Sequence, residues 1–120
     1  MATILIVDDV KTDREILGKI VAAAGHRAEY AVDGNEGITK AKTLKPALIL
    51  LDVVMPNLNG FEACRKLKGD PDTSGIPVVL VTSKGGDSDK FWGKKQGAND
   101  HVVKPFTAES LSAVIGRYIR

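Results

Sequence analysis

Four short apolar runs in the sequence end in polar or charged residues. In chain order, these residues are Asp8 and Asp9, Asp52, Thr82 with Ser83, and Lys104. A carboxylate at the end of a buried run is costly unless something compensates its charge. Carboxylates that lie close together also repel one another and raise each other's pKa values unless a cation joins them. If the run ends meet, they form an acidic pocket that needs a bound cation, with Lys104 supplying part of the positive charge.

Oxygen ligands of this kind favour Mg²⁺ and a phosphoryl-transfer reaction. A hard divalent ion suits carboxylate ligands, and Mg²⁺ keeps several waters when only one or two carboxylates bind it directly. Mg²⁺ and Lys104 would neutralise the charge on the phosphoryl oxygens. Asp52 would then attack the phosphorus atom in line, and Thr82 would donate a hydrogen bond to one phosphoryl oxygen. The product would be a labile aspartyl phosphate. Its formation would draw Thr82 toward the new oxygens and so couple the chemistry to the nearby surface.

Each of these residues taken alone has an ordinary structural explanation. A single aspartate after an apolar strand, such as Asp52, is usually a loop or helix-capping residue. Thr82 alone is typical of a turn, and Lys104 alone is typical of a solvated charge. The four run ends agree in position and in chemistry. This agreement favours one shared site over unrelated turns.

The run ends can meet only if the runs are neighbouring strands of one sheet. Short stretches rich in Val, Ile and Leu, with a less apolar second member, predict strands at 4–7, 28–31, 48–51, 78–81 and 101–103. Turn-forming or charged residues separate these stretches from the segments between them. We therefore expect five strands, four of which carry the polar residues named above at their carboxyl ends.

The segments between the strands carry apolar residues at helical spacing. We expect a first helix with the stripe Ile16, Leu17, Ile20, Val21 and Ala24, ended by Gly25; a second from near Asn35 to Lys45; a third marked by Leu58, Phe61, Cys64 and Leu67; a fourth over 87–96; and a fifth with Leu111, Val114, Ile115 and Tyr118, capped by Thr107. Cys64 should belong to the core. Gly93 weakens the fourth helix because glycine costs about 1 kcal/mol relative to alanine.

Strands that alternate with helices predict an α/β fold with a parallel sheet covered by helices on both faces. Ligands of such sheets bind outside the carboxyl ends of the strands, where the winding direction switches. The chemistry-bearing residues named above all lie at that edge. The predicted fold therefore brings them together.

Composition indicates one soluble domain with no bulk preference for nucleic acid or membrane. The chain has 120 residues, of which 43% are hydrophobic and 27% charged, and its net charge is +2. Cys64 is the single cysteine, so no internal disulfide can form. No run approaches the roughly 18 apolar residues of a membrane span, and no signal peptide is evident. We expect a cytoplasmic protein.

Four tracts of the sequence resemble response-regulator receiver domains, the family of the bacterial chemotaxis regulator. They are ILIVDD at 4–9, LLDVVMPNLNG at 50–60, PVVLVTS at 77–83 and NDHVVKPF at 99–106. The resemblance implies a flavodoxin-like (CheY-like) doubly wound (βα)5 fold with strand order 2-1-3-4-5. It also implies a single receiver domain over 1–120, with no output domain.

The same resemblance assigns a role to each residue of the pocket. Asp52 matches the phosphoacceptor, Asp9 a direct Mg²⁺ ligand and Asp8 a ligand through water. Val54 matches the residue whose backbone carbonyl binds the metal. Thr82 and Lys104 match the switch hydroxyl and the site lysine. The family also implies a cis peptide bond between Lys104 and Pro105.

A narrower resemblance concerns the tract DKFWGKKQGANDHVVKPF at 89–106. It is similar to stand-alone regulators of type IV pilus twitching motility. This implies a chemotaxis-like sensor histidine kinase as phosphodonor and a downstream motility or signalling protein. That protein would bind the face formed by the fourth helix, fifth strand and fifth helix, where Phe91 or Trp92 is a candidate exposed contact.

Two positions depart from the family pattern. His101 stands where receivers usually carry a Tyr or Phe that rotates inward on activation, so the switch is expected to be altered, and we expect its ring to face solvent. Val54 and Lys84 occupy the positions two residues after Asp52 and Thr82, where polar side chains in relatives help to place the hydrolytic water. Slow self-dephosphorylation follows from this.

Three alternatives to a phosphorylation-switched module stay open. A degenerate receiver would act as a phosphorylation-independent scaffold, and a phosphate sink would only drain a kinase. A haloacid-dehalogenase-like phosphatase is disfavoured because Val54 replaces its second aspartate. Under the favoured interpretation, the protein is no enzyme beyond catalysing its own phosphorylation and dephosphorylation.

Overall fold

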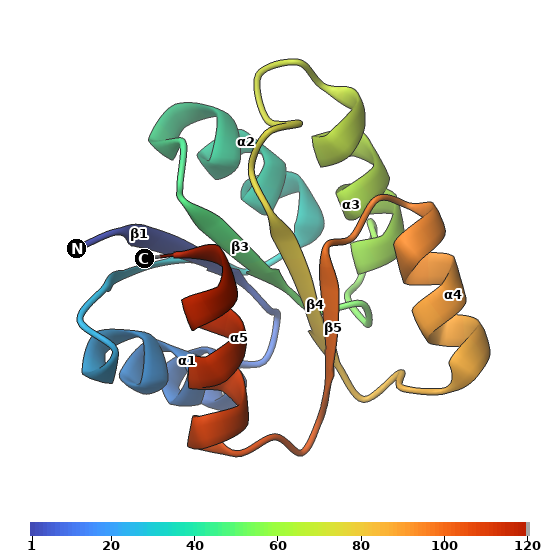
Figure 1. The fold of residues 1–120 in the computed structure, drawn as a ribbon. Helices are drawn as coiled ribbons and strands as arrows, with labels where there is room; N and C mark the ends of the chain where they lie inside the picture. The colour runs from blue at the N-terminus through green and yellow to red at the C-terminus, as the bar shows by residue number, and fades with distance from the viewer. Residues whose placement is uncertain (120) are drawn as a thin grey trace.

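The structure is a computed structural model that describes residues 1–119, leaving Arg120 outside the described part. The described residues form five strands and five helices that alternate along the chain (Figure 1). The strands are β1 (Thr3–Val7), β2 (Arg27–Ala31), β3 (Leu48–Leu51), β4 (Val78–Thr82) and β5 (Asp100–Val103). The helices are α1 (Lys11–Ala23), α2 (Gly34–Leu44), α3 (Gly60–Gly69), α4 (Asp87–Lys95) and α5 (Ala108–Tyr118).

All strand pairs are parallel, and the order in the sheet is β2-β1-β3-β4-β5. The flavodoxin-like topology is therefore confirmed. The register places Val7 opposite Leu51 and Thr82 opposite Val103. From β1 the chain first adds β2 on one side and then crosses back to add β3 on the other side. The winding direction therefore switches between β1 and β3, and ligands of such folds bind at the carboxyl ends of these two strands.

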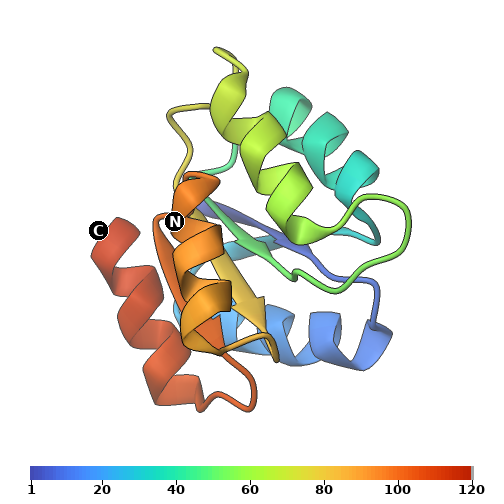
Figure 2. The same cartoon turned by 90° about the vertical axis from the view of Figure 1, so that its right-hand side faces the viewer.

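Helices cover both faces of the sheet, and each face has its own hydrophobic core (Figure 2). Alternate residues of a strand point to opposite faces, so Leu5 packs under α2 and α3 while Ile4 packs under α1 and α5. The α4 helix lies on the same face as α3 (Figure 1). Cys64 is buried on this face, which confirms its predicted place in the core.

Side-chain caps fix where three helices begin. Asp33, Asn59 and Thr107 each accept a hydrogen bond from a backbone N–H three residues on, at the starts of α2, α3 and α5. The cap predicted at Thr107 is confirmed. Gly25, with a φ of +87°, follows the end of α1, where glycine tolerates a conformation that other residues rarely adopt.

Three apolar residues assigned to helix stripes differ from the prediction. Ala24 is exposed and follows the last residue of α1. Ile16 belongs to α1, but its side chain is 50% exposed because it projects away from the sheet beside Leu17. Leu58 precedes α3 in a loop and is buried there, since capping by Asn59 starts the helix only at Gly60. Of the helices described, none is both long and apolar enough to cross a bilayer.

Gly93 has a packing role in α4 that the sequence prediction did not include. It is buried, and a Cβ at this position would lie 2.7 Å from Cδ1 of Leu80 and 3.5 Å from Nδ1 of His101. The glycine lets α4 approach β4 and β5 closely. Close packing therefore offsets part of the helix-propensity cost of Gly93, and the helix forms over nearly all of the predicted range.

Candidate functional site

Three carboxylates converge at the carboxyl ends of β1 and β3. One carboxylate oxygen from each of Asp8, Asp9 and Asp52 lies within 4.8 Å of the others. Asp8 and Asp52 are buried and Asp9 is exposed. The predicted acidic pocket is therefore present, because the register that places Val7 opposite Leu51 carries the next residues, Asp8 and Asp52, side by side.

The backbone after β3 holds one oxygen of Asp52 and leaves the other toward the pocket. Oδ1 accepts hydrogen bonds from the N–H groups of Val53, at 2.7 Å, and Val54, at 3.4 Å. The Gly60 N–H donates to the Val53 carbonyl at 2.9 Å, which ties this turn to the start of α3. Oδ2 lies 3.5 Å from Nζ of Lys104. Asp52 is thus oriented before any ligand arrives.

Lys104 reaches into the pocket from the loop after β5. Its backbone N–H donates to the Thr82 carbonyl at 2.9 Å, which extends the pairing of β4 with β5 to Lys104. Its ammonium contacts Asp13 at 2.8 Å, Asp8 at 3.0 Å and Asp52 at 3.5 Å. Burial acts to lower the pKa of Lys104, but hydrogen bonds with Asp13 and Asp8 and the nearby carboxylate charges outweigh it and raise that pKa. Lys104 is charged at neutral pH. Its peptide bond to Pro105 is cis, as predicted.

Asp13 belongs to the site although the sequence prediction left it out. It lies in the first turn of α1, and its carboxylate makes the shortest contact of Lys104 in the pocket. An acidic residue early in a helix is ordinary, since it interacts well with the helix dipole. The sequence near Asp13 does not indicate a role in the pocket, because its partner Lys104 lies 91 residues further along the chain.

The charged form of Asp8 is destabilised by the surroundings of its carboxylate in the pocket. Burial raises the pKa of its carboxyl group, the hydrogen bonds from Val10 and Lys104 lower it, and the Asp52 charge raises it again, with a net rise. A raised pKa means that the charged form is destabilised in the folded protein. A divalent cation joining these carboxylates would relieve that cost, so the oxygen-only donors fit Mg²⁺.

We expect Asp8→Asn to increase the free energy of unfolding at pH 7 in the absence of metal. Between the ordinary pKa of an aspartate and the raised folded-state value, the folded protein binds more protons than the unfolded chain, so the stability of the wild type falls as pH rises. The variant lacks this titration. Its advantage should grow with pH through that window and vanish below it, as measured by urea unfolding at several pH values.

Magnesium provides the control for this prediction. At ten times its Kd, an ion that binds only the folded state adds about 1.4 kcal/mol to the free energy of unfolding of the wild type. The Asp8→Asn variant should gain less. A variant that is less stable than the wild type at pH 7 without metal would contradict the account of Asp8.

Thr82 is fully buried at the end of β4, beside the pocket. Its Oγ1 accepts a hydrogen bond from the Lys84 N–H at 3.2 Å. The Lys84 carbonyl in turn lies 2.8 Å from Nε2 of His101. Because a carbonyl only accepts, Nε2 carries the proton. A continuous path of hydrogen bonds therefore joins Thr82 to β5.

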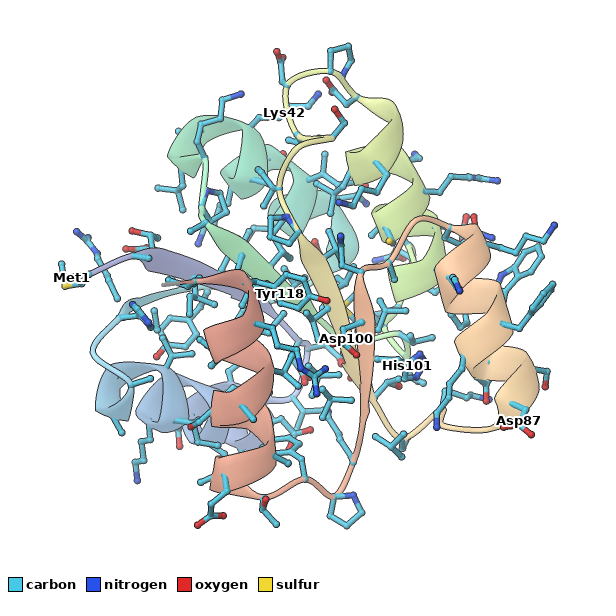
Figure 3. The ribbon with its side chains drawn as sticks, in the orientation of Figure 1. Met1, Lys42, Asp87, Asp100, His101 and Tyr118 are labelled. Carbon is cyan, nitrogen blue, oxygen red and sulfur yellow. The ribbon has the colours of Figure 1, made fainter. Side chains whose placement is uncertain are left out.

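The expectation that the ring of His101 faces solvent holds only in part, because the residue is half-buried. Figure 3 shows His101 between β5 and α4, and its Nδ1 is buried with no hydrogen-bond partner among residues 1–119. The ring turns inward because Gly93 leaves room for it and the Lys84 carbonyl accepts from it. His101 thus connects β5, the loop after β4 and α4.

The outer surface of α4 carries apolar and basic side chains. Phe91 is 62% exposed and Trp92 51% exposed, so both project outward, where the sequence indicated one of them. The ammonium of Lys95 lies 5.6 Å from the centre of the Phe91 ring. Val54, on the loop after β3, also has an exposed side chain.

Comparison with known proteins gives one consistent family. The response regulator receiver domain model matches residues 4–116. Protein PilH of Pseudomonas aeruginosa is 46% identical over 115 residues, covering 96% of this chain and 95% of that protein. Chemotaxis protein CheY4 of Vibrio cholerae is 32% identical, covers 99% of each chain and superposes with a TM-score of 0.93.

A further solved structure has the same fold. It is the receiver domain of sensor histidine kinase PA1611 from Pseudomonas aeruginosa, which is described with a magnesium ion coordinated in its active site cleft. Its identity is 24%, its TM-score is 0.91, and the match covers 98% of this chain and 97% of that one. At this identity the likeness concerns the fold.

Proposed function

The chain belongs to the response regulator receiver domain family, and from this premise we propose that it is switched by transient phosphorylation of Asp52. The observation that carries the proposal is the convergence of Asp8, Asp9, Asp52 and Lys104 at the sheet's switch point, with Thr82 beside them. A phosphorelay partner would supply the phosphoryl group. The resulting change at the surface would alter binding to a downstream protein.

The residues of the pocket divide the work of the transfer. Oδ1 of Asp52 is occupied by backbone N–H donors, so Oδ2 forms the new bond to phosphorus as the bond from phosphorus to the donor breaks. Lys104 then donates to a phosphoryl oxygen in place of a carboxylate. The hydroxyl of Thr82 donates to another.

The pocket would hold one Mg²⁺ ion. Asp9 and Asp52, the backbone carbonyl of Val54 and, through water, Asp8 are the ligands that we propose for it. The ion, when bound, would neutralise negative charge on the phosphoryl oxygens. Asp8, Asp9 and Asp52 are close enough for one ion to join them.

A groove beside Lys104 supports a protein as the phosphodonor. It has a volume of about 410 Å³ and is lined by Asp13, Ile16, Ser83, Lys104, Pro105 and Phe106. Ile16 is half exposed on its wall. Exposed apolar surface next to a reactive group is typical of a protein-binding site. A chemotaxis-like sensor histidine kinase fits this requirement and the family of the chain.

The output surface that we propose is the face of α4, β5 and α5. Movement of Thr82 toward a phosphoryl group would shift the Lys84 backbone, and Lys84 would carry the shift to His101. His101 packs against α4, so it would replace the usual aromatic switch with a hydrogen-bonded one. Phe91 and Trp92 are exposed on the helix that would respond.

Pilus-driven motility is the process in which we place this switch. The support is the identity with protein PilH over nearly the whole length of both chains. The output would be either activation of a motility protein or removal of phosphate from the kinase. Reconstitution with a chemotaxis-like sensor histidine kinase, followed by measurement of phosphate transfer over time, separates the two outcomes.

Beryllofluoride, a mimic of the phosphoryl group, tests the proposal directly. Trp92 is the single tryptophan of the chain, so its fluorescence reports on α4 alone. We expect a saturable fluorescence change that requires both Mg²⁺ and beryllofluoride and that Asp52→Ala removes. No response in the wild type would favour a phosphorylation-independent scaffold, and turnover of an external phosphate ester would favour a phosphatase.

Loss of the phosphoryl group should be slow, with a half-life longer than seconds at 25 °C. The side chain of Val54 offers no hydrogen bond to place an attacking water, and the side chain of Lys84 is exposed. We expect Val54→Asn to speed the decay by about tenfold, a modest effect for a group that positions a reactant. Decay is followed by the intact mass of the phosphorylated protein after removal of a small phosphodonor.

The matched control for this prediction is Val54→Ala, which shortens the side chain and keeps it apolar. Its decay should equal that of the wild type. Decay of the wild type within seconds, or equal acceleration by both substitutions, would show that Val54 does not limit access of the hydrolytic water.

A further inference from the structure

We propose that Asp13 is a positioning residue that holds Lys104 away from Asp52 and competes with the phosphoryl group for it. The inference rests on the proposed phosphorylation of Asp52 and adds a regulatory contact to the same site. The Nζ atom of Lys104 lies 2.8 Å from Asp13 and 3.5 Å from Asp52. The lysine is therefore bound more closely to the helix than to the residue that reacts.

The placement of Asp13 makes it suited to this role. It belongs to the first turn of α1, so its carboxylate approaches Lys104 from the side of the helix, whereas Asp8 and Asp52 approach from the sheet. Its side chain is 33% exposed, while those of Asp8 and Asp52 are buried. Water can solvate Asp13 when the lysine leaves. The contact between Asp13 and Lys104 can therefore break without leaving Asp13 as a buried, unpaired charge.

The contact should act in opposite directions on metal and phosphoryl binding. While Asp13 holds Lys104, the lysine stays 3.5 Å from Asp52 and compensates its charge incompletely, which leaves negative charge for a cation. When Asp52 carries a phosphoryl group, the ammonium must leave Asp13 to donate fully to the new oxygens. Asp13 therefore favours metal binding and opposes the phosphorylated form.

Asp13→Asn separates these effects. We expect its Mg²⁺ affinity to fall by roughly fivefold and its beryllofluoride affinity at saturating Mg²⁺ to rise by roughly fivefold, the size of a partly exposed ion pair. Calorimetry measures the first, and Trp92 fluorescence the second. Asp13→Glu, which keeps the charge on a side chain one methylene longer, should restore both affinities toward the wild type.

The chain offers a matched control on the same helix. Glu15 lies in α1, is exposed, and pairs with Lys11 at 3.9 Å without contacting Lys104. Glu15→Gln removes the same charge and should leave both affinities within about twofold of the wild type. In a Lys104→Met background, Asp13→Asn should change beryllofluoride affinity no more than Glu15→Gln does.

The outcomes distinguish this inference from the proposed function. Beryllofluoride binding that Asp13→Asn weakens or leaves unchanged would overturn the competition, even though the wild type responds. An equal effect of Glu15→Gln, or an effect that persists without Lys104, would overturn it as well. A wild type without any beryllofluoride response would refute phosphorylation of Asp52, and Mg²⁺ affinity would still decide whether Asp13 controls Lys104.

Discussion

Asp52→Asn should abolish phosphorylation by acetyl phosphate and by any kinase. An amide cannot attack phosphorus to form an acyl phosphate, while its oxygen can still accept from the Val53 N–H as Oδ1 of Asp52 does. The fold should therefore persist while the chemistry is lost. Intact mass after incubation with acetyl phosphate and Mg²⁺ should show one added phosphoryl group on the wild type and none on the variant.

The control is the same substitution at the opposite edge of the sheet. Asp72 is exposed in the loop between α3 and β4, at the amino end of the strands. Asp72→Asn should accept phosphate as the wild type does, because this loop lies away from the pocket. If Asp52→Asn were still phosphorylated, another residue would be the phosphoacceptor, and peptide mapping would identify it.

Gly60→Ala should destabilise the protein strongly and displace Asp52. A Cβ at position 60 would overlap the carbonyl oxygen of Asp52 and would lie 2.7 Å from Cα of Val53. These are backbone atoms next to the strand end, and they cannot move aside as the tip of a side chain can. We expect a loss of about 3 kcal/mol, the upper end of ordinary overpacking, measured by urea unfolding. Beryllofluoride binding should weaken in parallel.

Gly69→Ala is the matched control, because Gly69 ends the same helix. An added Cβ there meets nothing within 4 Å. Replacing a helical glycine in open space should change stability by no more than about 1 kcal/mol, toward greater stability. Equal losses for the two variants would mean that Gly60 is needed for the helix and not for its approach to Asp52.

The site residues could be predicted because their positions follow from local pattern. Each of Asp8, Asp52 and Thr82 lies at or next to the end of a strand, and parallel strands bring such ends to one edge of the sheet. The strand order came from the family resemblance, and the structure confirms it. Burial of Asp8, which raises its pKa, follows from the same placement.

Other features depend on residues that meet only in three dimensions. Asp13 gave no signal, because its contact with Lys104 joins a helix turn to a loop 91 residues later. The inward position of His101 depends on Gly93, which the sequence marked only as a weak point in a helix. Ile16 is half exposed, although it belongs to the apolar stripe of α1. The stripe in the sequence therefore does not predict the width of the helix face that the sheet buries.

The alternation of strands and helices, the acidic strand ends and the presence of Lys104 near them could all be predicted from the amino-acid sequence. These features are local, since periodicity and turn residues act over a few positions. Three other features depend on the folded chain: which carboxylate lies nearest Lys104, how the ring of His101 is oriented and how closely α3 approaches Asp52. Those outcomes depend on distances between segments far apart in the chain, which packing sets and local pattern does not encode.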